Sequence, residues 1–137
     1  MKTNWLILGA SSPIAKAFIE KAASSSRRFI LVGRDSEDLN LTAQHIQIKY
    51  HVNCEVIALD LQPPASHKLI ADRIQKSRHN LSLFIAHTYM SDNDKLDDNK
   101  IEKSIQVNIA ATCQVIHAFV TQARSPKSII YLSSVAG

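Results

Sequence analysis

The feature that most constrains the fold of this chain is the alternation of short apolar runs with segments of helical periodicity. The runs are apolar at nearly every position rather than at every second one, and they are rich in β-branched residues. They span residues 5–8, 29–32, 56–59, 81–86 and 128–132, and most of them end at Gly, Asp or Ser. Strands that are buried on both faces of a parallel sheet have this composition. The sequence therefore predicts five parallel strands.

Four segments between these runs are predicted to be helices. Pro13 suits the first turn of the first helix, and Asp35 or Ser36 can cap the second. Pro63 and Pro64 open the third helix. The expected apolar faces are Ile14, Ala17, Phe18 and Ala22; Leu39, Ala43 and Ile46; Leu69, Ile70 and Ile74; and, in a long fourth helix over 98–124, Ile101, Ile105, Ile109, Thr112, Ile116 and Phe119.

Strands that alternate with helices predict an α/β domain with right-handed crossovers. We expect a doubly wound parallel sheet with strand order 3-2-1-4-5 and helices on both faces. A ligand cleft is expected at the carboxyl ends of the strands, where the order reverses. The 137 residues are enough for one ordinary domain and too few for two, so residues 1–137 are expected to form one domain.

Composition and charge argue against several classes of protein. The 16 Lys and Arg outnumber the 12 Asp and Glu, but they are scattered along the chain, which argues against a nucleic-acid partner. Cys54 and Cys113 lie far apart, which excludes a disulfide scaffold and a Cys-based metal site and suits the reducing cytoplasm. The first apolar run is shorter than the roughly 7–15 residues of a signal peptide core, and no run approaches the ~18 residues of a membrane span. We therefore expect a cytoplasmic protein without membrane, nucleic-acid or metal partners.

The turn between the first strand and the first helix is a candidate binding element. It reads Leu-Gly-Ala-Ser-Ser-Pro-Ile-Ala over residues 8–15. Gly9 permits a tight turn, and the hydroxyls of Ser11 and Ser12 can donate hydrogen bonds. The helix N-terminus attracts anionic oxygens, such as those of a dinucleotide pyrophosphate. Taken alone, the turn is equally compatible with a plain connection between a strand and a helix.

Four more motifs lie at the expected strand ends and in the last helix. They are Gly33-Arg34, Asp60-Leu61, Asn108, and Ser-Ser-Val-Ala-Gly over 133–137. With this order and spacing, the chain resembles the short-chain dehydrogenase/reductase family, in its compact single-domain branch. The resemblance covers essentially all of residues 1–137, but only the N-terminal half or so of a typical member. It implies a Rossmann-like, NAD(P)-binding domain that is incomplete at its C-terminal end relative to the family.

The resemblance assigns cofactor-binding roles to the turn and to the next two strand ends. Pro13 and Ala15 stand where the family has its second and third glycines, and Pro13 removes one N–H donor. Arg34 resembles the NADP-preferring members, whose guanidinium binds the 2′-phosphate, although Asp35 follows directly and can oppose this preference. NADP is therefore expected, with NAD as an alternative, and a solvated Arg34 is the other interpretation. The expected cofactor-binding residues are Gly9, Ser11, Ser12, Pro13, Ile14, Gly33, Arg34, Asp60 and Leu61.

Asp60 is expected to accept a hydrogen bond from the adenine amino group, to cap the third helix, or to do both. Asn108 matches the family's helix asparagine, which supports a proton relay, and Ser134 matches the catalytic serine that holds the substrate carbonyl oxygen. The family's Asn-Asn-Ala-Gly is replaced by Ala-His-Thr-Tyr over 86–89, in which His87 is either a substitute donor or a structural residue with its hydrogen bonds satisfied. The family also uses a tyrosine with a lysine four residues later. None of the three tyrosines of this chain is followed by that lysine.

The resemblance implies an NAD(P)-dependent oxidoreductase that transfers a hydride to or from a ketone or a secondary alcohol. This chain alone is expected to be inactive and to be part of a longer reductase. The alternatives are a non-enzymatic dinucleotide-binding or dimerisation module, and a remnant that merely folds. We also expect a homo-oligomer that forms through the 98–124 helix, because that helix is apolar on more than one side and the fifth strand leaves an exposed sheet edge.

Overall fold

The computed structural model describes residues 2–77, 80–90 and 95–133. Its elements alternate as expected from the sequence, with a short 3₁₀ segment (η1) and a π-helical segment (η3) added. In chain order they are β1 (Thr3–Leu8), α1 (Pro13–Ala22), η1 (Ala23–Ser25), β2 (Ser26–Gly33), α2 (Ser36–Tyr50), β3 (Asn53–Ala58), α3 (Ser66–Gln75), β4 (Leu81–Ile85), α4 (Asp98–Ile105), η3 (Gln106–Ala110), α5 (Ala111–Gln122) and β5 (Pro126–Tyr131).

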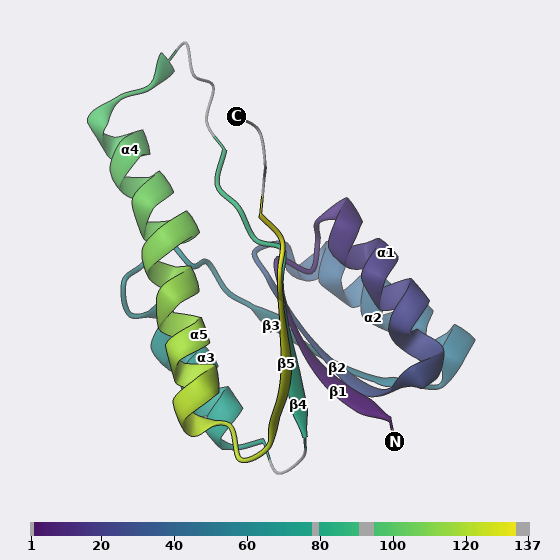
Figure 1. Ribbon diagram of the computed structural model, residues 1–137. Coiled ribbons are helices and arrows are strands. Elements are labelled where there is room, and N and C mark those ends of the chain that lie inside the picture. Colours follow the sequence, from purple (N-terminus) through teal and green to yellow (C-terminus); the bar gives the residue numbers. More distant parts are fainter. Residues whose placement is uncertain (1, 78–79, 91–94, 134–137) are drawn as a thin grey trace.

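The five strands form one parallel sheet in the order β3-β2-β1-β4-β5, which confirms the predicted topology. Helices α1 and α2 cover one face of the sheet, and α3 and α5 cover the other (Figure 1). The chain leaves β1 toward β2 on one side and returns to pair β4 on the other side. The strand order therefore reverses between β1 and β4, where a doubly wound sheet opens a cleft at its carboxyl edge.

Each face of the sheet has its own apolar core. Leu6 and Leu8 of β1 pack on the side of α3 and α5, whereas Ile7 packs on the side of α1 and α2. Successive side chains of a strand point to opposite faces, so a strand that is covered on both faces is apolar at nearly every position. This explains the apolar runs of β1, β2 and β4. The expectation of burial on both faces is wrong for β5, which lies at the edge of the sheet and is exposed at every position, and β3 at the other edge is only partly buried.

The N-terminal caps of the first two helices agree with the sequence. The Ser12 side chain accepts a hydrogen bond from Ala15 N at 3.1 Å, and Pro13 occupies the first turn of α1. The Asp35 side chain, rather than that of Ser36, caps α2. The predicted apolar face of α1 is wrong, since its buried residues are Ala15 and Ile19 and Ile14 is exposed. The predicted face of α3 is partly wrong, since Ile70 and Ile74 are buried but Leu69 is exposed.

The prediction of one continuous helix over 98–124 is wrong. The π-helical segment η3 separates α4 from α5, and in it the Ala111 N–H donates to Gln106 O, five residues back. The extra residue in this turn breaks the 3.6-residue periodicity on which the predicted stripe depended. Figure 1 also shows α4 extending past the carboxyl ends of the strands, where the sheet offers it no surface to pack against.

The faces of this helical region therefore differ from those expected. Ile101, Ile105 and Ile109 are 41%, 51% and 58% exposed. The face that packs on the sheet is instead formed by Val107, Ala111, Thr112, Val115, Ala118 and Phe119. Of the predicted stripe, only Thr112 and Phe119 are buried, and Ile116 is half-buried. An exposed apolar stripe thus runs along α4 and η3.

Candidate functional site

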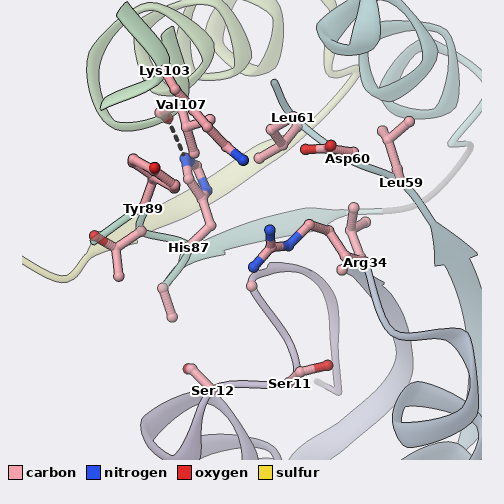
Figure 2. A pocket seen from close by; sticks show the side chains of 15 residues that line it. Ser11, Ser12, Arg34, Leu59, Asp60, Leu61, His87, Tyr89, Lys103 and Val107 are labelled. Atoms are coloured by element: carbon pink, nitrogen blue, oxygen red, sulfur yellow. Dashed lines mark hydrogen bonds between the residues drawn. The ribbon is translucent and has the colours of Figure 1, made fainter. Parts of the chain in front are cut away.

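A cleft of about 290 Å³ opens at the carboxyl edge of the sheet, at the position where the strand order reverses (Figure 2). Seven of the nine predicted cofactor-binding residues line it, and they come from three separate turns. These residues are Gly9, Ser11, Ser12, Gly33, Arg34, Asp60 and Leu61. The segment after β4 and the helical region of α4 and η3 form the opposite wall, with His87, Tyr89, Lys103 and Val107 among its residues. The fold therefore brings together motifs that are far apart in the sequence.

The turn after β1 requires a glycine at position 9. Gly9 has a φ of +72°, a conformation that side-chain-bearing residues rarely adopt. A Cβ atom at this position would lie 2.4 Å from the backbone nitrogen of His87. The turn is closed by hydrogen bonds from Ala10 N to Val32 O and from Ser12 N to Gly9 O, both 3.0 Å long. The glycine thus allows the turn to pack directly against the end of β4.

Pro13 and Ile14 do not line the cleft, and both side chains are exposed. Pro13 lies at the start of α1, where the backbone N–H has no partner within a helix. Its missing N–H therefore does not disturb the helix, although it removes one donor from the helix N-terminus. The predicted contribution of these two residues to cofactor binding can come only from their backbone or from a weaker contact at the rim.

An ion pair joins the first two helices. Lys16 of α1 and Asp38 of α2 form a salt bridge, and the ammonium of Lys16 holds the pKa of Asp38 below its usual value. The charge of Asp38 is therefore neutralised by Lys16. It does not cancel the positive charge of Arg34 at the mouth of the cleft.

Arg34 is exposed and reaches into the cleft, and among the described residues it has no carboxylate within ion-pair distance (Figure 2). Asp35, which the sequence left as a competitor, does not line the cleft. Its Oδ1 accepts a hydrogen bond from Asp38 N at 3.0 Å as the cap of α2. The acidic side chain is thus engaged by its own helix, and the arginine is left to face the cleft.

Asp60 and Leu61 follow β3, as predicted, and both line the cleft. Asp60 Oδ1 accepts a hydrogen bond from Gln62 N at 2.9 Å. The alternative interpretation, in which Asp60 caps α3, is wrong, because α3 begins at Ser66 and its N-cap residue is Ala65. Asp60 is exposed, so its carboxylate can still accept from a ligand.

Asn108 lies in η3 and holds the segment that follows β4. Its Oδ1 accepts from Tyr89 N at 2.7 Å, and its Nδ2 donates to Tyr89 O at 2.9 Å and to Ser104 Oγ at 3.2 Å. Asn108 does not line the cleft, so in this structure it acts on the cleft through Tyr89. Ser134, the predicted catalytic serine, lies outside the described residues.

His87 is the substitute donor that the sequence allowed. Its Nε2 lies 3.1 Å from Val107 O and 2.9 Å from Thr112 Oγ1. Because a carbonyl oxygen only accepts, Nε2 carries the hydrogen in the pair with Val107. Burial lowers the pKa of His87, which favours the neutral ring. The imidazole thus joins the end of β4 to η3 and to the start of α5.

These features define a class of protein: a doubly wound α/β domain with a glycine turn, a helix N-terminus and a cationic cleft at the switch point of its sheet, as in dinucleotide-binding domains. Comparison with known proteins is more specific. The model of the short chain dehydrogenase family matches residues 3–137, and the chain belongs to this family.

The relatives of the chain include proteins named as enzymes and others named as inactive. The 7beta-hydroxysteroid dehydrogenase of Collinsella aerofaciens is 28% identical over 96% of this chain and 51% of its own length. The human inactive hydroxysteroid dehydrogenase-like protein 1 is 28% identical over 83% of this chain and 36% of its own length. The mouse very-long-chain 3-oxoacyl-CoA reductase is 26% identical, with coverages of 98% and 46%. The chain spans about half the length, or less, of these curated relatives.

Solved structures agree with the fold. A structure from work on 7beta-hydroxysteroid dehydrogenase stereoselectivity superposes with a TM-score of 0.82 at 26% identity, covering 96% of this chain and 53% of that one. A short-chain dehydrogenase from Sphingobium yanoikuyae in complex with NADPH also has a TM-score of 0.82, at 23% identity, with coverages of 97% and 54%. Among the described residues, no helix is long and apolar enough to cross a membrane.

Proposed function

We propose that residues 1–137 are the NAD(P)-binding domain of a short-chain oxidoreductase that transfers a hydride to or from a ketone or a secondary alcohol. The observation that carries the proposal is the cleft itself. It gathers the glycine turn, the α1 N-terminus, Arg34 and Asp60 at the carboxyl edge of the sheet. A Cβ atom at position 9 would collide with the backbone after β4, so glycine is required for the turn to lie this close to the strand end.

The residues that would hold the cofactor follow from their chemistry. The positive end of α1 and the hydroxyls of Ser11 and Ser12 suit the pyrophosphate, and Arg34 suits a 2′-phosphate. The Asp60 carboxylate suits the adenine amino group, beside the apolar side chain of Leu61. The bound nicotinamide supplies the hydride chemistry. NADP is the proposed cofactor, because Arg34 faces the cleft while the Asp35 carboxylate caps α2.

The catalytic assignment extends beyond the described residues. We propose that Ser134 holds the substrate oxygen and that Asn108 supports the site by holding the backbone of Tyr89. No tyrosine of this chain has a lysine four residues later, so this chain alone is expected to bind the cofactor without turnover. The small-molecule alcohol or carbonyl would be converted by a longer, cytoplasmic protein.

Self-association is part of the proposal. The exposed side chains of Ile101, Ile105 and Ile109 form an apolar stripe along α4 and η3, and all of them fall within the predicted 98–124 interface. Exposed apolar surface of this kind commonly marks a contact with another protein. Sedimentation equilibrium tests this part: the mass is expected to exceed 15.2 kDa, and Ile105→Glu is expected to shift it toward the monomer.

The proposed cofactor is tested by ligand-dependent stabilisation. At about 100 times its Kd, NADPH raises the free energy of unfolding by about 2.7 kcal/mol, which corresponds to roughly 8–10 °C in Tm for a chain of this size. NADH at the same concentration is expected to give a smaller shift. No shift with either nucleotide would refute the dinucleotide-binding function.

A second function is favoured by the segment after β4. Ala-His-Thr-Tyr replaces the family's Asn-Asn-Ala-Gly, and two of the relatives are named as inactive. The chain would then be a non-enzymatic dinucleotide-binding or dimerisation module. A turnover assay on a longer form with panels of ketones and secondary alcohols separates the two functions. Cofactor binding with no turnover on any substrate, while a related reductase turns over in the same assay, would favour the module.

A further inference from the structure

The cleft contains a second cation to which no motif assigns a role. Lys103 of α4 lines the wall opposite the β2 turn, and Figure 2 shows its side chain and that of Arg34 both reaching into the cleft. Lys103 is half-buried, and its Nζ lies 4.7 Å from the centroid of the Tyr89 ring. Attraction between an ammonium and an aromatic face restricts where the ammonium lies. Lys103 is thus held at the cleft rather than extended into solvent.

Ion pairing separates Arg34 and Lys103 from other cations of the chain. Neither of them lies within ion-pair distance of a carboxylate among the described residues. The cations that do have such a partner are Lys16, Arg28, Lys49, Arg73 and Lys100. Other unpaired cations in the described part of the chain, such as Lys21 and Lys76, are exposed and lie outside the cleft. Asp60 is the one acid among the described residues that line the cleft, so the cleft carries a net positive charge.

The position of Lys103 depends on Tyr89, which stands where the family pattern has a glycine. Asn108 fixes the Tyr89 backbone through two hydrogen bonds of 2.7 and 2.9 Å. The fixed backbone presents the ring, and the ring holds the ammonium. A glycine at this position offers no such surface. The two residues therefore form one unit that brings a cation to the far wall of the cleft.

We propose that Lys103 is a cofactor-binding residue whose ammonium pairs with a phosphate of the dinucleotide, across the cleft from Arg34. This inference rests on the proposed function, because it names a further residue of the same binding site. Two groups share this chemistry, the pyrophosphate and the adenosine 2′-phosphate. Only NADPH carries the second group, so a comparison of NADPH with NADH distinguishes them.

The test measures the Kd of NADPH and of NADH by isothermal titration calorimetry for the wild-type chain, Lys103→Gln and Lys103→Arg. The matched control is Lys100→Gln, on the same helix, where the lysine pairs with Asp97 and lies outside the cleft. Loss of one charge-assisted hydrogen bond predicts roughly tenfold weaker NADPH binding for Lys103→Gln. Lys103→Arg is expected to keep most of the affinity, and Lys100→Gln to change it by less than about twofold.

The outcomes are distinct. A loss with both nucleotides assigns Lys103 to the pyrophosphate, and a loss with NADPH alone assigns it to the 2′-phosphate. Unchanged affinities of Lys103→Gln for both nucleotides overturn the inference and leave the proposed function intact. If the wild-type chain binds neither nucleotide, the proposed function fails and this inference fails with it. Lys103→Met, which keeps an apolar stem over the Tyr89 ring, replaces Lys103→Gln if that variant does not fold.

Discussion

Replacing Gly9 with alanine tests the turn on which the cofactor cleft depends. The φ of +72° costs an L-residue about 1–2 kcal/mol. The added Cβ would lie 2.4 Å from His87 N and 2.6 Å from His87 Cα, and these backbone atoms cannot swing aside as a flexible side chain can. Overpacking of this kind costs roughly 1–3 kcal/mol more. The free energy of unfolding is therefore expected to fall by about 2–5 kcal/mol, a large part of the ~5–15 kcal/mol of an ordinary domain.

Urea denaturation followed by circular dichroism measures this loss. With a slope of about 1–3 kcal/mol per molar urea, the midpoint of Gly9→Ala is expected to fall by roughly 1–3 M. The matched control is Gly33→Ala in the same cleft, because a Cβ there meets its nearest atoms at 3.5 Å, an ordinary van der Waals distance. That variant is expected to stay within about 1 kcal/mol of the wild type. Equal midpoints for the two variants would show that the steric reasoning about position 9 is wrong.

Three further variants test other parts of the cleft. Arg34→Glu is expected to weaken NADPH binding tenfold or more in titration calorimetry and to spare NADH binding, because a bidentate contact with the 2′-phosphate is lost. The control is Arg27→Glu at the far end of β2. An unchanged preference for NADPH over NADH would contradict the role of Arg34. Burial lowers the pKa of His87, so the unfolded state takes up the proton first, and the wild type is expected to lose stability as the pH falls below about 6.5. His87→Asn is expected to lose less stability than the wild type over the same range, measured by urea denaturation between pH 7.5 and 5.5. An equal pH dependence of the two proteins would contradict this reasoning. Asn108→Ala removes both hydrogen bonds to the backbone after β4 and is expected to lower the free energy of unfolding by about 1–3 kcal/mol. The control Asn40→Ala, on the exposed face of α2, is expected to lower it far less. Equal losses would refute the anchoring role of Asn108.

The central strands β1, β2 and β4 could be predicted because burial on both faces requires apolar side chains at nearly every position, whereas β5 has the same apolar pattern although its side chains are exposed. Leu6 and Ile7 are adjacent in the chain, yet each lies in a different core, so both must be apolar. The sequence does not decide which residue caps α2, because Asp35 and Ser36 are both good N-cap residues. Only the structure shows that the Asp35 carboxylate accepts a hydrogen bond from the backbone of α2. Because Asp35 is engaged in this contact, it does not oppose the positive charge of Arg34 in the cleft. No pattern in the sequence predicts this outcome.

The last helix could not be predicted because its apolar pattern assumes a constant pitch. The π-helical segment at Gln106–Ala110 changes that pitch without any Gly or Pro to mark it, and the stripe that begins at Ile101 faces solvent. The place of Lys103 in the cleft could not be predicted for a related reason. Its place at the cleft depends on where α4 lies relative to the end of β4, and one lysine among scattered basic residues carries no local signal.

The cleft also allows a test that separates a binding domain from a remnant that merely folds. Arg34 and Lys103 bring two like charges to one cleft, which Asp60 only partly offsets, and repulsion between them is unfavourable when no anion is bound. Residues that serve binding often reduce stability in this way. The double variant Arg34→Gln with Lys103→Gln is therefore expected to have an equal or slightly higher Tm than the wild type without ligand, and to lose most of the Tm increase caused by NADPH. The measurement is a thermal melt of both proteins with and without NADPH at low and at 0.5 M salt, since salt screens the repulsion and the binding alike. An equal increase in Tm for both proteins would show that these two cations do not serve the cofactor.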